Sequence, residues 1–180
     1  MPTDDMPIEP STKVAALLDR YPELEEVLIE MAPPFKKLRN PILRRSVAKI
    51  ASLRQAAAAG RLPVAELVNR LRAEVGQEAM AFEDDAGTES YFSRQPDWFD
   101  RTKIVASIDE REGSDPDKMT VVEVLQRAAR LQEGEIVELI TTFVPAPGID
   151  TMKGKGFLVW SVQEKNGVIR TYFSKPVRPQ

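Results

Sequence analysis

The sequence predicts an α+β protein in which a small all-helical domain is followed by a β-α-β-α-β-β two-layer sandwich. Apolar residues recur at helical spacing in residues 12–76, whereas strand-like and helical stretches alternate in residues 103–180. Net charge changes at the same places. It is −3 in residues 1–11, +5 in residues 12–76, −5 in residues 77–102 and zero in residues 103–180. These segments predict a loose or disordered N-terminus, a helical domain, an acidic aromatic linker and a two-layer sandwich.

Four helices are predicted in the helical domain, each marked at its ends by proline, glycine or a capping residue. We expect them in residues 11–21, 22–34, 40–60 and 63–76. Ser11 or Thr12 caps the first. The third, NPILRRSVAKIASLRQAAAAG, is the clearest, because Asn40 caps it, Pro41 occupies its first turn and Gly60 ends it. Its inner apolar stripe consists of Leu43, Val47, Ile50 and Ala57.

The acidic linker carries more aromatic side chains than a solvated tether needs. They are Phe82, Tyr91, Phe92, Trp98 and Phe99. We expect part of the linker to pack onto a domain through these rings. A platform that binds a ligand is the alternative interpretation.

Strands and helices alternate in the second half of the chain. The strands are predicted in KIVASID, EIVELITTFVP, FLVWSVQEK and VIRTYFS. A helix is predicted from Met119 to Leu131, and a short turn or helix in APGIDTMKGKG. The dipeptide Asn166-Gly167 predicts a tight hairpin turn between the last two strands. This order of elements is typical of a sheet covered by helices.

Two residue types are absent from the whole chain: it contains no cysteine and no histidine. These absences exclude disulfides, thiolate nucleophiles, cysteine-ligated metals and histidine acid–base chemistry. The chain has no run of about 18 apolar residues, and its start, MPTDDMPIEP, is unlike a signal peptide. We therefore expect a cytoplasmic protein with no cofactor and no membrane partner.

The stretch SIDEREGSDPDK, residues 107–118, lies where the first strand leads into a helix. Such junctions often carry the chemistry of small α/β domains. Asp109 and Arg111 are alternate residues, so their side chains can point to the same side and clasp the turn. We expect Asp115 to cap the helix, with Pro116 in its first turn.

Four features of the second half occur together: Asp109 at a strand end, Pro116 at a helix start, the LQEGE turn and the GKGFLVW stretch. On these features residues 103–178 resemble the TusA/SirA-like family of sulfur carriers and its cysteine-free relatives of unassigned function. In the carriers a cysteine precedes the proline, and Asp115 stands at that position here. The resemblance implies the fold and a remnant carrier site, formed by Asp109, Arg111, Asp115 and Pro116, without persulfide chemistry.

The helical half contains the stretches VAALLDRYPELEEVL, PPFKKLRNPILRR and VAKIASLRQAA. On these stretches residues 12–74 resemble a small domain of unknown function, similar to the N-terminal domain of ScdA-type di-iron proteins that repair iron–sulfur clusters. Some relatives carry a Cys-Cys pair or histidines, and this chain has neither. Relatives of the second half often accompany hemerythrin-like or sulfur-relay partners, and that context implies a bacterial setting in redox, nitrosative-stress or sulfur metabolism.

A basic run, KKLRNPILRRSVAKIASLR, covers residues 36–54 with seven basic residues and no acid. Its candidate partner-binding residues are Lys36, Lys37, Arg39, Arg44, Arg45 and Lys49. At about 100° per residue, Arg45 and Lys49 fall opposite the apolar stripe. The run is interpreted as a solvated surface, as a site for an anionic protein partner or the acidic linker, or as a nucleic-acid site. Arg54 lies near the stripe and is predicted to be an internal arginine paired with Asp19 or Glu23.

The leading functional hypothesis is a non-catalytic adaptor or regulatory protein that binds a protein partner. It rests on two recognisable small domains in a chain that lacks the most reactive residue types. A nucleic-acid-binding module that uses the basic face from Lys36 to Arg54 is the first alternative. An enzyme that uses carboxylate or lysine chemistry is the second. The sequence leaves the oligomeric state open.

Overall fold

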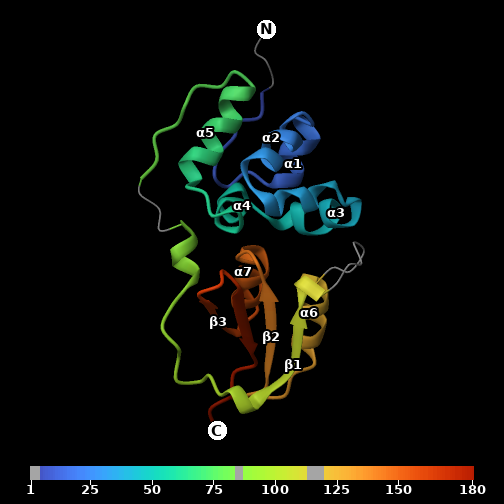
Figure 1. Cartoon of the computed structure of the whole chain (residues 1–180), viewed down its shortest axis with the longest axis vertical. Helices are drawn as coiled ribbons and strands as arrows, with labels where there is room; N and C mark the ends of the chain where they lie inside the picture. The colour runs from blue at the N-terminus through green and yellow to red at the C-terminus, as the bar shows by residue number, and fades with distance from the viewer. Residues whose placement is uncertain (1–4, 84–86, 113–119) are drawn as a thin grey trace. The chain divides into compact units, whose positions relative to one another are not determined.

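The computed structural model describes residues 5–83, 87–112 and 120–180, and for residues 120 and 121 the backbone only. The chain divides into two compact units, Met1–Thr88 and Glu89–Gln180. The first is helical, and the second contains a four-stranded mixed sheet with helices (Figure 1). This architecture confirms the α+β class. Within the described ranges, no helix combines the length and the apolar composition needed to cross a membrane.

Unit 1 is built from short helices around a core of leucine side chains. Its helical segments are α1 (Val14–Arg20), α2 (Leu24–Met31), η1 (Pro33–Arg39), α3 (Pro41–Ile50), α4 (Leu53–Gly60) and α5 (Val64–Glu74). Leu17, Leu28, Leu53 and Leu67 are fully buried and come from four different helices. Ile8 is also fully buried. The packed part of unit 1 therefore begins before residue 12, earlier than the charge pattern predicts.

The predicted helix over residues 40–60 is two helices, which is the largest difference from the sequence prediction. The chain is extended at Ala51, and Ser52 starts α4 with a capping box: its hydroxyl accepts from the Gln55 amide, and the Gln55 side chain accepts from the Ser52 amide. This local chemistry overrides the continuous helical period. As a result Ile50 is 44% exposed instead of belonging to the inner stripe. Arg54 is exposed as well, so its prediction as an internal arginine is wrong.

Two helix ends also differ from the prediction. Helix α1 is preceded by Lys13 as its N-cap, without a side-chain cap bond, so neither Ser11 nor Thr12 caps it. At the end of α4 the left-handed residue is Arg61, with φ of 56°, rather than Gly60. Gly60 serves packing instead, because a Cβ atom there would lie 3.0 Å from the Ala32 Cβ.

Unit 2 has the predicted order of elements (Figure 1). They are β1 (Ile104–Asp109), α6 (Thr120–Ala129), β2 (Ile136–Thr141), α7 (Ala146–Gly154), β3 (Leu158–Gln163) and β4 (Ile169–Ser174). The strand order is β1-β2-β4-β3, with β1 parallel to β2 and the other neighbours antiparallel. The hairpin turn forms as predicted: Gly167 has φ of +82°, and the Asn166 side chain accepts a bond from the Val168 amide at 3.1 Å.

The two faces of the sheet are covered by different parts of the chain. Helices α6 and α7 cover one face, where a core forms among residues from both helices and from three strands. Its buried members are Ile108, Val124, Ala128, Leu131, Val137, Leu139, Met152 and Phe173. On the opposite face Phe99 packs against Trp160 and Tyr172, with ring centroids 4.7 and 4.5 Å away. The linker thus supplies part of the cover that helices supply on the first face.

The acidic linker is therefore divided between the two units. Met80 and Phe82 pack against the core of unit 1. Trp98 and Phe99 pack against the sheet of unit 2, and the Tyr91 hydroxyl donates to Asp150 at 2.8 Å. Most of its aromatic rings are structural, because each packs within the unit to which it belongs.

Replacing each of two linker aromatics should destabilise a different unit. Phe99→Ala should lower the free energy of unfolding of unit 2 by about 2–4 kcal/mol, because it opens a cavity beside Trp160. Both tryptophans lie in unit 2, so tryptophan fluorescence during denaturant unfolding follows that unit. Phe82→Ala should instead shift the helical transition seen by circular dichroism and leave the fluorescence transition in place. A shift of the fluorescence transition by Phe82→Ala would contradict this division of the linker.

Candidate functional site

The six candidate basic residues of η1 and α3 fall into two groups, and the first group is paired within unit 1. Arg39 donates from Nη2 to both oxygens of Glu26, at 3.2 and 3.0 Å. Arg44 makes an ion pair with Glu25 in which both side chains are partly buried. Both glutamates lie in the first turn of α2. Arg39 and Arg44 therefore tie η1 and α3 to α2.

The second group faces solvent. Lys36, Lys37, Arg45 and Lys49 are exposed. Within the part of the chain that the structure describes, Lys36, Arg45 and Lys49 have no ion-pair partner. The basic run is thus only partly available to a binding partner, and its available part is concentrated on η1 and the outer side of α3.

Two large apolar side chains lie on the same side of α3 as Arg45 and Lys49. Ile42 is 41% exposed and Ile50 is 44% exposed. At about 100° per residue, Ile42, Ile50 and these two basic residues fall within an arc of about 140°. Asn40 fixes the start of the helix, because its side chain accepts a bond from the Ile42 amide at 2.9 Å. We call Ile42, Arg45, Ser46, Lys49 and Ile50 the α3 outer face.

Sequence reasoning found the basic members of this face and missed the apolar ones. A helix that continues through Ala51 predicts Ile50 on the inner stripe, whereas α3 ends at Ile50. The signal that could have exposed the error is the Ser52-x-x-Gln55 pattern, a capping box in the middle of the predicted helix.

In unit 2, Asp109 and Arg111 form the clasp that their alternate spacing predicts. Asp109 ends β1, and Arg111 lies in η4 (Glu110–Glu112). The Arg111 amide and Nε both donate to Asp109 Oδ1, at 2.9 and 2.8 Å. The hydrogen bond from the Arg111 side chain, supported by the one from its amide, holds the pKa of the Asp109 carboxyl below its ordinary value. The other two members of the candidate remnant site, Asp115 and Pro116, lie outside the described residues.

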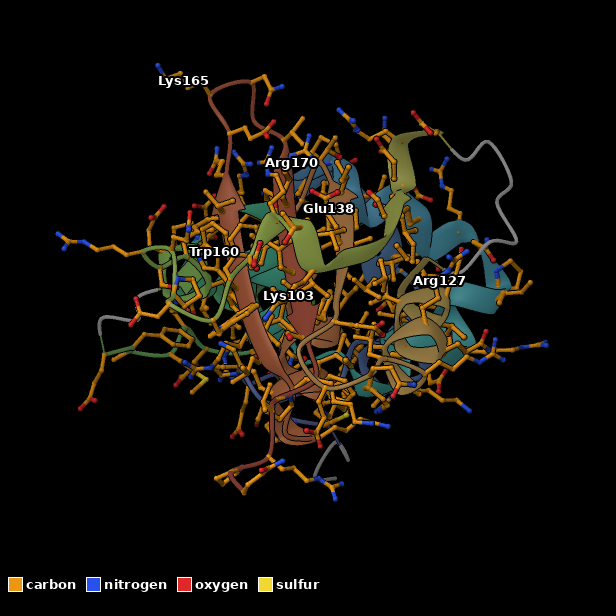
Figure 2. The ribbon with its side chains drawn as sticks, turned by 90° about the horizontal axis from the view of Figure 1, so that it is seen from below. Lys103, Arg127, Glu138, Trp160, Lys165 and Arg170 are labelled. Carbon is orange, nitrogen blue, oxygen red and sulfur yellow. The ribbon has the colours of Figure 1, made fainter. Side chains whose placement is uncertain are left out.

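A second polar cluster, which sequence reasoning missed, lies on the sheet face opposite α6 and α7. Glu138 on the central strand β2 is 8% exposed. It accepts a hydrogen bond from the Ser107 hydroxyl on β1 at 2.7 Å and one from Arg170 Nη1 on β4 at 2.7 Å. Arg170 also donates from Nε to Glu164 at 2.6 Å. Figure 2 shows Glu138 and Arg170 close together on this face, with Trp160 further along it.

The electrostatics of this cluster keep both charges in place. Burial by itself would raise the pKa of the Glu138 carboxyl, but hydrogen bonds from Ser107 and Arg170 hold that pKa below its ordinary value. The hydrogen bonds to Glu138 and Glu164 raise the pKa of Arg170 above its ordinary value. Every buried side-chain nitrogen or oxygen of the described residues has a hydrogen-bond partner. The cluster is therefore a satisfied ion-pair network, in which Glu138 is poorly suited to accept a proton from a substrate.

Among the described residues, no group of three or more acidic side chains is arranged to hold a metal ion. Residues 8–68 are similar to a family described as a domain of unknown function (DUF1858). This match covers about a third of the chain and lies entirely within unit 1. Neither the curated proteins nor the solved structures contain a match to the chain.

Removing the buried carboxylate should make unit 2 less stable in a pH-dependent way. The pKa of Glu138 is lowered in the folded state, so its stabilising effect is present above the ordinary glutamate pKa and disappears as the pH falls through the lowered value. Glu138→Gln should therefore cost about 1–3 kcal/mol at neutral pH. The gap to the wild type should narrow below about pH 4.

Denaturant unfolding followed by tryptophan fluorescence at several pH values measures this gap. Glu133→Gln is the matched control, because Glu133 pairs with Arg178 at 3.7 Å on an exposed surface and should matter little. A gap between Glu138→Gln and the wild type that is constant with pH would show that the network does not stabilise the charged carboxylate.

Proposed function

We propose that the protein is a non-catalytic adaptor that binds a protein partner through the α3 outer face. The observation that supports this most is the combination, on one side of a short helix, of two exposed isoleucines with two cations that have no ion-pair partner among the described residues. Apolar side chains beside arginine are typical of protein-binding surfaces. Elsewhere in unit 1, apolar side chains of this size are concentrated in the core.

A nucleic-acid partner is the weaker proposal for the same face. Binding to nucleic acid depends on many phosphate contacts, each made by a cation. Arg39 and Arg44 are already paired with Glu26 and Glu25, which reduces the positive charge that the basic run presents. The exposed isoleucines add nothing to phosphate binding.

The absence of catalysis is supported by the chemistry of unit 2. The strand-end position holds an aspartate–arginine clasp, and the buried Glu138 is held ionised by its partners. The chain has no thiol that could carry sulfur. An enzyme built on carboxylate or lysine chemistry is the remaining alternative, and neither polar cluster of unit 2 favours it.

We further propose that unit 2 is a cysteine-free member of the TusA/SirA-like fold family, and that unit 1 is related to the N-terminal domain of ScdA-type proteins. The order of elements in unit 2 and the position of Asp109 at the end of β1 support the first relationship. The match of residues 8–68 to a domain of unknown function is compatible with the second. These relationships suggest a bacterial cytoplasmic adaptor in redox, nitrosative-stress or sulfur metabolism.

Reversing the charges of the α3 outer face should abolish capture of the partner. The experiment uses the full chain as bait in a lysate of the source cells and identifies retained proteins by mass spectrometry. Arg45→Glu combined with Lys49→Glu should reduce the retained amount of the specific partner roughly tenfold or more, because an anionic partner surface would then meet like charges.

The matched control makes the same charge change in unit 2, with Lys153→Glu and Lys165→Glu. Lys165 lies in the exposed turn between β3 and β4 and points away from the sheet (Figure 2). The control should retain the partner as the wild type does. Loss of the partner after nuclease treatment would support the nucleic-acid alternative. If the charge-reversed chain retains the same proteins as the wild type, the proposal is refuted.

A further inference from the structure

We infer that the partner segment recognised by the α3 outer face is an acidic amphipathic α-helix. This inference rests on the proposed adaptor function and specifies the chemistry of its partner. It follows from three features of this face. They are the ridge formed by Ile42, Ser46 and Ile50, the position of the two cations beside that ridge, and the kind of contact that a helix surface offers.

The shape of the ridge fits a second helix. Ile42, Ser46 and Ile50 follow each other at intervals of four residues, so they form one line along α3, and the two isoleucines are about 12 Å apart along its axis. The Ser46 hydroxyl donates to the Ile42 carbonyl at 2.7 Å. Position 46 therefore presents a small side chain whose polar group is already satisfied, between two large apolar neighbours.

This arrangement produces a hole of the kind that receives a side chain in helix pairs. A hole is formed by four residues at positions i, i+3, i+4 and i+7 of one helix. Ile42, Arg45, Ser46 and Lys49 have this spacing, and Ser46 leaves room at the centre. A leucine of a partner helix, placed over Ser46, would contact Ile42 and the aliphatic parts of Arg45 and Lys49.

The cations specify the charge of the partner. Arg45 and Lys49 are four residues apart, so they lie one above the other along one flank of the ridge. A partner helix with glutamate or aspartate along the matching flank would place opposite charges together. A basic helix would place like charges together and is disfavoured.

An extended partner is less suited to this face than a helical one. A strand binds by adding to the edge of a sheet through backbone hydrogen bonds. The α3 outer face offers mainly side chains, because the backbone groups in the middle of an α-helix are bonded within the helix. Recognition of an amphipathic helix by anchors at repeated spacing uses side chains in this way.

The test is a titration of the isotope-labelled full chain with a designed helical peptide, followed by nuclear magnetic resonance. The probe contains alanine, leucines that recur every seven residues, and glutamates along one flank. Saturable shifts should concentrate in residues 41–50. A peptide with lysine in place of glutamate, and one with serine in place of leucine, should each bind roughly tenfold more weakly or worse.

Variants of the chain provide the second arm of the test. Ile42→Ser combined with Ile50→Ser should weaken binding of the acidic peptide roughly tenfold, while circular dichroism shows an unchanged fold. Val177→Ser is the matched control, because Val177 is an exposed apolar residue of unit 2, at 66%. It should bind the peptide as the wild type does.

The inference would be overturned by shifts outside α3, by equal binding of the leucine-free peptide, or by self-association of the chain that Ile42→Ser abolishes. The last would identify a second copy of the chain as the occupant. If the peptide fails to bind but the charge-reversed chain still loses its captured partner, the adaptor function stands and the helical nature of the partner segment is refuted. If neither peptide binding nor partner capture depends on Arg45 and Lys49, the adaptor proposal fails as well.

Discussion

The α3 outer face depends on how the inner side of that helix is held, by the apolar contacts of Ala48 and by the ion pair between Arg44 and Glu25. Arg44 is the residue of α3 that points toward α2, and at about 100° per residue it lies almost opposite Ile42. The Arg44 and Glu25 side chains are 33% and 18% exposed, so this partly buried pair is more sensitive to loss of one partner than the exposed pair of Arg39 with Glu26. Arg44 lies on the inner side of α3 together with the buried Ala48, so Ile42 and its neighbours lie on the outer side, which binds a partner in our account.

Unit 2 depends on how its sheet is shielded from water. A sheet has two faces, and each part of each face must be covered by other residues or be polar. Two helices cover one face. On the other, Phe99 covers the part around Trp160, and the ion pair of Glu138 with Arg170 makes a further part polar and internally satisfied. This division explains why the linker carries aromatic residues and why a glutamate occupies the central strand. Both features are accounted for by stability, whereas the two exposed isoleucines of the α3 outer face are not.

The sequence was sufficient for the fold class because the hydrophobic period changes between the two halves and the Asn166-Gly167 turn has a strong local signal. It was insufficient where local capping competed with a continuous period, as at Ser52, and this error placed Ile50 inside. The Glu138 network could not be predicted from spacing, because Ser107 and Arg170 are 31 and 32 residues away from Glu138 in the chain and meet it only through the strand order. The Asp109–Arg111 clasp was predictable, because both residues lie within one turn.

Light-induced cross-linking from α3 in cells tests the central claim most directly. An aliphatic diazirine amino acid at position 42 keeps that side chain apolar, and the same amino acid at position 177 is the control, since Val177 is also exposed. Our account predicts a protein adduct from position 42 that is absent from position 177 and is lost when Arg45 and Lys49 are both replaced by glutamate. Adducts from position 42 no more abundant than those from position 177, or adducts with nucleic acid, would contradict it.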